Sequence, residues 1–195
     1  MEHSGQKHTE NPKLFMILIG ATPKGRNIEQ HDVFFGIANS VKELLPEMKA
    51  FWPEAKDKIH IDAYRIVNKV GTYKVTVVAK ADESKEDLTS LFFLNLGGYK
   101  EGEFEELHYK MLVVADQKAL AIKEAKESAF YKHTGFKGAT SHIDDKFGVD
   151  VDDIFEIKDI LTVETKNKYA LKFSPAEGLA EDPLVLGYIP LSKLA

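Results

Sequence analysis

An internal repeat is the feature that most constrains the fold of this 195-residue chain. The apolar run Leu14–Gly20 aligns with Leu91–Gly97 at an offset of 91 − 14 = 77 residues, and the ungapped alignment continues as far as Ala38 and Ala115. Seven of these 25 aligned positions are identical, which is hard to obtain by chance. The identities include Gly25 with Gly102, Glu29 with Glu106, and His31 with His108.

Three further matches follow in the same order along the chain, and their offset only grows. Residues 50–52 match 129–131 at an offset of 79, and 60–62 match 142–144 at an offset of 82. Tyr73 then matches Tyr169 at an offset of 96. The growth of 96 − 82 = 14 residues falls around the acidic stretch 144–159, which we interpret as an insertion. Self-similarity of this kind indicates a repeated structural unit.

Each unit is predicted to be β-β-α-β-β. Apolar runs that end at glycine or a turn predict buried strands. Asn39 and Asp116 are suited to begin the helices, because their side chains accept free backbone N–H groups, and Pro46 should kink or split the first helix. The predicted strands are 14–20, 31–38, 58–67 and 73–80 in the first unit, and 91–97, 109–115, 154–163 and 169–174 in the second.

The predicted fold class is α+β: two tandem units packed about a pseudo-two-fold axis, with mainly antiparallel sheets. One helix per unit covers at most one face of a four-stranded sheet. The other face must pack on the second unit or on a second identical chain, so we also expect a homodimer. The predicted divisions are a flexible tail 1–13, a first unit 14–80, a linker 81–89, a second unit 90–174 with the acidic insertion, and a C-terminal tail or edge strand 175–195.

Several stretches of the chain resemble a bacterial family known as domain of unknown function 1543. These stretches are Leu14–Gly20, Gly25–Gly36 and Ala50–Pro53, together with His60–Asp62 and His142–Asp145. The family has one or two copies of its domain in a chain, so two copies here would be in keeping with it. The resemblance covers nearly the whole chain outside the tails and implies no particular activity.

Composition excludes several classes of site and partner. The chain has no cysteine, which removes disulfides, thiolate nucleophiles and cysteine-bound metals. Its net charge of −5 argues against a general nucleic-acid binder, which needs a basic surface. No apolar run is long enough to span a membrane, and the polar residues 1–13 do not read as a signal peptide. A cytoplasmic protein is therefore expected.

Two short patterns in both units carry the candidate site residues. Glu-x-His occurs at Glu29/His31 and Glu106/His108, and His-x-Asp occurs at His60/Asp62 and His142/Asp144. Residues two apart on a strand share a face, so each pair would point the same way. Imidazole with carboxylate suits zinc or a similar divalent ion, and it also suits acid–base catalysis. The competing interpretation is structural: a carboxylate often only fixes a histidine ring, and residues kept in both halves of a duplication are often architectural.

Two other segments offer weaker candidates. Lys24, Gly25 and Arg26 form a basic turn that could hold an anion, although an ordinary hairpin turn explains it as well and the second unit lacks the charges. The acidic stretch suggests calcium, but its spacing does not fit an EF-hand, and a surface loop with an inward apolar edge explains it equally well.

The sequence leaves two functional hypotheses. The first is a non-enzymatic module that binds a small ligand or a protein partner, and the absence of a recognised catalytic signature favours it. The second is a divalent-metal-dependent or acid–base enzyme that uses the His, Asp and Glu pairs. No cofactor is strongly implied.

Overall fold

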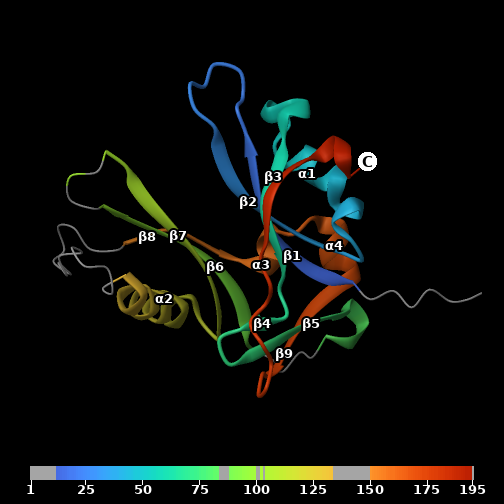
Figure 1. Cartoon of the computed structure of the whole chain (residues 1–195). Helices are drawn as coiled ribbons and strands as arrows, with labels where there is room; N and C mark the ends of the chain where they lie inside the picture. The colour runs from blue at the N-terminus through green and yellow to red at the C-terminus, as the bar shows by residue number, and fades with distance from the viewer. Residues whose placement is uncertain (1–11, 84–87, 100–101, 103, 134–149, 195) are drawn as a thin grey trace, which may run out of the picture.

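The computed structural model describes residues 12–83, 88–99, 102, 104–133 and 150–194. Within them, antiparallel strands form three sheets accompanied by a few helices (Figure 1). The predicted α+β class with mainly antiparallel strands is therefore confirmed. None of the described helices combines the length and the apolar character needed to cross a membrane.

The first sheet has the strand order β10-β3-β1-β2. Its strands are β1 (Lys13–Ala21), β2 (Gln30–Ala38), β3 (His60–Ile66) and β10 (Val185–Pro190). One face is covered by the 3-10 helix η1 (Val41–Leu44), the helix α1 (Leu45–Phe51) and the 3-10 segment η2 (Pro53–Lys58). Pro46 lies in the first turn of α1, where its missing N–H costs no helical hydrogen bond, and this explains the predicted split of the helix.

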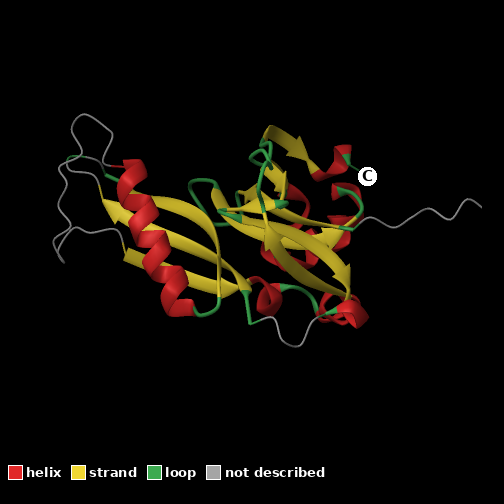
Figure 2. Cartoon of the chain, turned by 90° about the horizontal axis from the view of Figure 1, so that it is seen from below, coloured by secondary structure: helices red, strands yellow, loops and turns green. Residues whose placement is uncertain are grey.

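The second sheet has the strand order β7-β6-β8. Its strands are β6 (Ser90–Tyr99), β7 (Glu106–Ala115) and β8 (Asp150–Glu156). The helix α2 (Lys118–His133) lies across one face of this sheet (Figure 2). Ala121 and Ala125 of α2 are buried against the sheet, because their small side chains let the helix approach closely.

The third sheet joins the two halves of the chain through the pair β5–β9. Its strands are β4 (Lys69–Val70), β5 (Tyr73–Ala79) and β9 (Tyr169–Pro175). Short helical segments complete the described chain: η3 (Lys80–Asp82), α3 (Ile157–Ile160), α4 (Val163–Lys168) and η4 (Leu191–Lys193).

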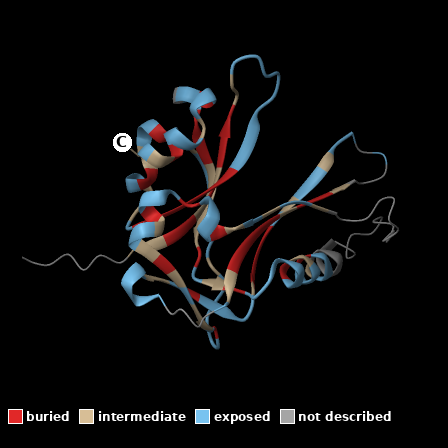
Figure 3. Cartoon of the chain, turned by 180° about the vertical axis from the view of Figure 1, so that it is seen from behind, coloured by how far each residue is buried: buried red, intermediate tan, exposed pale blue. Residues whose placement is uncertain are grey.

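The first and second sheets face one another across the largest buried cluster. Alternate residues of β1 and β2 point into it, and so do alternate residues of β6 and β7, because side chains on a strand alternate between the two faces. Phe35 of β2 and Phe93 of β6 meet there, with ring centres 5.3 Å apart. We call the sides that face this cluster the inner faces. Buried residues concentrate where the sheets meet, and the end of the β1–β2 hairpin is exposed (Figure 3).

The acidic stretch differs from its sequence interpretation. Residues 150–156 form β8, which pairs with the central strand β6 and so belongs to the sheet, whereas the sequence predicts an acidic insertion before a strand that begins only at 154. Val151 and Ile154 pack on the side of α2, while Asp152 and Asp153 are exposed. The strand predicted over 154–163 ends at Glu156 and is followed by α3 and α4. His142 and Asp144 lie outside the described residues.

Candidate metal centre

Three strands of the first sheet bring four predicted site residues to one place. Gly20 near the end of β1 pairs with His31 of β2 on one side and with His60 of β3 on the other. Residues opposite one another in adjacent strands share a face, so both imidazoles stand on the inner face above Gly20. The register shifts between Ile61 and Ala63, which leaves Asp62 as an extra residue in β3. Bulges of this kind re-aim side chains and are frequent beside functional sites.

Histidines and carboxylates alternate around a closed ring, which we call the first cluster. His31 Nε2 lies 3.6 Å from Glu29 Oε2 and 3.2 Å from Asp62 Oδ2. His60 Nε2 lies 2.9 Å from Glu29 Oε1 and 3.4 Å from Asp62 Oδ1. In a tetrahedral zinc site with bonds of about 2.0–2.1 Å, neighbouring ligand atoms are about 3.3–3.4 Å apart. The sides of the ring, 2.9–3.6 Å, scatter around that spacing. Each carboxylate turns one oxygen towards His31 and the other towards His60, so these sides do not give the mutual spacing of four single donor atoms. Among the described residues, the set whose donor atoms all lie within 4.8 Å of one another is Glu106, His108 and Asp152.

The protonation of His60 follows from its surroundings. Its Nδ1 lies 3.3 Å from the backbone carbonyl oxygen of Lys58, and a carbonyl can only accept, so Nδ1 carries the hydrogen. The other ring nitrogen, Nε2, is buried and has no hydrogen-bond partner among the described residues, although Glu29 Oε1 is within reach. Asp62 Oδ2 is likewise buried and has no hydrogen-bond partner among the described residues. Metal-binding histidines commonly donate one ring N–H to a backbone carbonyl and leave the other nitrogen for the metal.

The ring is buried on one side and open on the other. The side chain of His60 is 5% exposed, whereas those of Asp62, His31 and Glu29 are 25%, 42% and 43% exposed. Tyr188 of β10 lies against His60, with ring centres 4.3 Å apart and 36° between their planes. The cluster therefore has a fixed, buried histidine at its base and two solvent-accessible groups through which an ion could enter.

Gly20 is the residue that makes room for the ring. A Cβ atom at this position would lie 2.5 Å from Asp62 Oδ2 and 2.6 Å from His60 Nε2. Both approaches are closer than real Cβ contacts, so the two groups could not remain in place.

We therefore expect Gly20→Ala to weaken metal binding by about 10–100-fold, because it displaces two of the four donors. The same substitution should lower the free energy of unfolding by about 1–3 kcal/mol through overpacking. Competition titration with a chromophoric zinc chelator and urea denaturation measure the two effects. The control is Gly25→Ala: a Cβ there would meet nothing within 4 Å, so only its backbone strain is added. Equal zinc affinity in Gly20→Ala and wild type would show that the absence of a side chain at Gly20 is not needed for metal binding.

A second cluster forms at the corresponding place in the second sheet. His108 Nε2 lies 3.9 Å from Glu106 Oε2 and 3.4 Å from Asp152 Oδ2, and ligand atoms of all three residues lie within 4.8 Å of one another. Gly97 pairs with His108, and a Cβ at Gly97 would clash with the carboxylate of Asp152. The side chains of His108, Glu106 and Asp152 are 38%, 36% and 32% exposed. The second cluster therefore lacks a buried donor such as His60 and is more open than the first.

Asp152 has the same place in the second sheet that Asp62 has in the first. The alignment placed His142 and Asp144 opposite His60 and Asp62. In the structure, β8 pairs with β6 as β3 pairs with β1, so Asp150 opposes Gly97 as His60 opposes Gly20. Both pairings also shift register at the next residues, which puts Asp152 at the place of Asp62. The strand is not predicted there because its buried residues, Val151 and Ile154, are separated by two aspartates, one of them the extra residue of the bulge.

The remaining candidates lie apart from the clusters. Lys24, Gly25 and Arg26 are exposed in the turn between β1 and β2, where Gly25 has φ +85° and Arg26 N–H donates to the Pro23 carbonyl oxygen over 3.2 Å. That backbone N–H is therefore occupied by the turn itself. Anion binding at this turn stays a prediction.

Sequence reasoning did not find Gly20, Gly97, Asp152 or Tyr188 as parts of the clusters. The two glycines were visible as the matched ends of the repeated apolar runs, and glycine inside a strand marks a close approach of another group. Tyr188 carried no signal, because a strand from the C-terminal segment brings it to His60 from 128 residues away in sequence.

Comparison with known proteins supports the fold and leaves the chemistry open. Residues 26–77 match the family described as Domain of Unknown Function (DUF1543), a match that includes all four residues of the first cluster. A crystal structure of the protein Il1583 from Idiomarina loihiensis is similar to 93% of this chain and 99% of its own, with a TM-score of 0.60 and 22% identity. No curated protein matches the sequence.

Proposed function

We propose that this protein binds a divalent transition-metal ion, such as zinc, at the first cluster. Two imidazoles and two carboxylates form a donor set that suits zinc and neighbouring transition metals. The observation that carries the proposal is the buried Nε2 of His60, which is without a hydrogen-bond partner among the described residues and faces Glu29 and Asp62. A nitrogen lone pair held beside two carboxylates is unfavourable unless a cation lies between them.

The alternative for the same residues is a metal-free ring of ion pairs that could serve acid–base chemistry. In that case His60 would carry hydrogens on both ring nitrogens, and its Nε2–H would donate to Glu29 Oε1 at 2.9 Å. A charge-assisted hydrogen bond at this distance should be well aligned. Among the described residues Nε2 of His60 forms no such hydrogen bond, which favours the metal.

We expect one zinc ion per chain to bind tightly and to stabilise the fold. A ligand that binds only the folded state at 100 times its Kd adds about 2.7 kcal/mol to the free energy of unfolding. Elemental analysis after dialysis measures the stoichiometry, and calorimetric melting with and without zinc measures the stabilisation. Magnesium is the matched control, since it prefers oxygen ligands and retains its water. Protein free of metal after dialysis, with an unchanged melting temperature in zinc, would refute the proposal.

The second cluster should bind the same ion more weakly, because it provides one imidazole where the first provides two. Titration of the full chain should show one strong and one weak event, and His108→Gln should remove only the weak one. Loss of the strong event in His108→Gln would show that the assignment of the two sites is reversed.

We also propose that the two clusters are equivalent positions of a tandem duplication. The hairpins β1–β2 and β6–β7 have the same pairing: Gly20 opposes His31, and Gly97 opposes His108, at an offset of 77. Their connecting turns carry Gly25 at φ +85° and Gly102 at φ +81°. In the β5–β9 pair, Thr76 opposes Lys172, which is also its partner at the sequence offset of 96. A local two-fold axis through that pair would relate the units.

The predicted homodimer needs a separate argument. The inner faces of the two sheets already pack on one another within a single chain, which provides the cover that a second chain was expected to give. Dimerisation therefore stays a prediction, and sedimentation measures it.

A further inference from the structure

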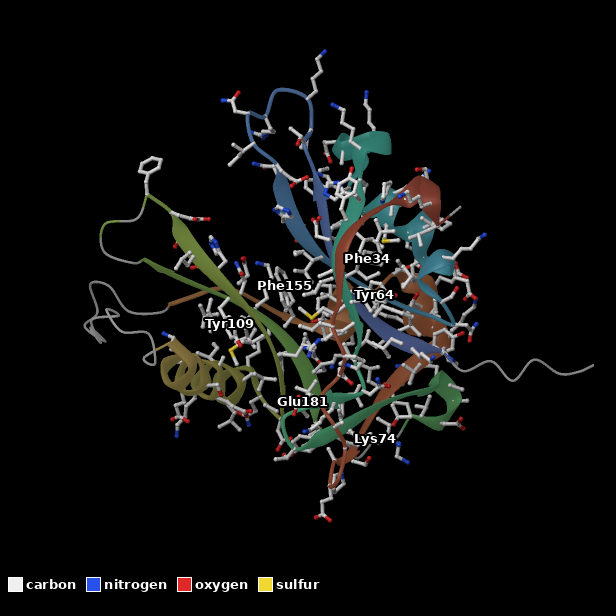
Figure 4. The ribbon with its side chains drawn as sticks, viewed as in Figure 1. Phe34, Tyr64, Lys74, Tyr109, Phe155 and Glu181 are labelled. Atoms are coloured by element: carbon white, nitrogen blue, oxygen red, sulfur yellow. The ribbon has the colours of Figure 1, made fainter. Side chains whose placement is uncertain are left out.

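A cavity of about 370 Å³ lies between the first and second sheets, on the side of β3, β4 and β7. Its apolar wall includes Met16, Leu18 and Leu112, which belong to or pack against the cluster between the inner faces. Tyr64 of β3 and Tyr109 of β7 also border the cavity, although their rings pack in the clusters on the outer faces of the two sheets, and Figure 4 shows Glu181 below them. The cavity is distinct from the first cluster: none of the four ring residues lines it.

Basic side chains from both sheets also line this cavity. Arg65 of β3 opposes Met16, and Lys110 of β7 opposes Asn95, so each stands on the inner face of its sheet. Lys69 is the third, and its Nζ is paired with Glu181 Oε1 at 2.5 Å. Arg65 is half-buried, and no described residue forms an ion pair or side-chain hydrogen bond with it or with Lys110.

The charge balance of the cavity is opposite to that of the protein. Three cations and one carboxylate line it, in a chain with a net charge of −5. A half-buried guanidinium without a counter-ion is costly, and an anion between Arg65 and Lys110 would offset that cost. The apolar wall beside these cations would remove a short hydrocarbon chain from water.

We propose that this cavity binds a small amphipathic organic anion, with its carboxylate between Arg65 and Lys110 and its apolar part against Met16, Leu18 and Leu112. The anion and the metal would use separate residues on the same pair of inner faces. The proposal therefore stands independently of metal binding at the first cluster.

Octanoate is the probe, and octan-1-ol is its uncharged match. Isothermal titration calorimetry should give 1:1 binding of octanoate to the full chain, and Arg65→Gln should weaken it at least tenfold. Lys74→Gln is the control, because it removes the same charge from an exposed position on β5 that does not line the cavity (Figure 4). Octanoate should bind equally to Lys74→Gln and wild type, and octan-1-ol should bind at least tenfold more weakly than octanoate.

The titration is carried out on metal-free and on zinc-loaded protein, because a carboxylate could also bind a metal ion at the first cluster. The same loss in Arg65→Gln in both states supports the cavity. Binding only to zinc-loaded protein, with Arg65→Gln equal to wild type, would overturn the proposal. An equal loss of octanoate affinity in Arg65→Gln and Lys74→Gln would also overturn the proposal, since that result would report the overall charge of the protein. The absence of octanoate binding in both the metal-free and the zinc-loaded protein would overturn it as well.

Discussion

Replacing His60 by glutamine is expected to raise the zinc Kd of the first cluster by at least about 100-fold, which is the upper end of the loss caused by disturbing residues around a metal ligand. His60 is the most buried of the four donors, and its ring orientation is fixed by the Lys58 carbonyl and by Tyr188. Glutamine keeps a polar side chain of similar reach but removes the imidazole nitrogen. Competition titration with a chromophoric zinc chelator measures the change.

His108→Gln is the matched control for that substitution, because it makes the same chemical change at the second cluster. The strong zinc affinity should stay within about twofold of wild type in this variant, because residues without shared partners act independently. Far-UV circular dichroism of both metal-free variants checks that the fold is kept. A His60→Gln protein that folds and binds zinc as tightly as wild type would remove His60 from the site.

Phe93→Ala is expected to lower the free energy of unfolding by about 3–5 kcal/mol, the range for removing a buried phenylalanine ring. Phe93 is 7% exposed and packs with Phe35 where the inner faces of the two sheets meet. Losing the ring leaves a cavity at the contact that holds the sheets together. Urea denaturation followed by circular dichroism measures the loss.

Phe155→Ala tests whether position, and not ring size, sets this cost. Phe155 opposes Phe93 in the β6–β8 pair and so lies on the same inner face, but it is 42% exposed. Because much of its surface stays in water, we expect its removal to cost about 1 kcal/mol or less. Similar losses in the two variants would show that Phe93 does not hold the two sheets together.

The sequence predicted those elements whose signal is local. Strands 14–20, 31–38 and 73–80 match β1, β2 and β5 closely, since an apolar run ending at a turn residue determines a strand with little help from the rest of the chain. The pairing of Glu29 with His31 and of His60 with Asp62 followed from the two-residue period of a strand. That all four would meet did not follow, because it depends on β1 lying between β2 and β3.

The sequence did not predict features of two kinds. In one, charged residues interrupt the alternation of apolar and polar residues that marks a strand. In the other, segments that are distant in sequence meet in the fold. In β8 only Val151 and Ile154 mark the buried face, and three aspartates at positions 150, 152 and 153 made the strand resemble a surface loop. The bulge that turns Asp62 towards the ring arises from pairing between strands, as does the one at Asp152. Tyr188 reaches His60 only because β10 pairs with β3.

X-ray absorption spectroscopy at the zinc edge, on the full chain loaded with one equivalent of zinc, tests metal binding at the first cluster most directly. We predict two imidazole nitrogens and carboxylate oxygens at about 2.0–2.2 Å, with one imidazole fewer in His60→Gln. A spectrum of zinc surrounded by oxygen alone, or one unchanged by His60→Gln, would contradict the account.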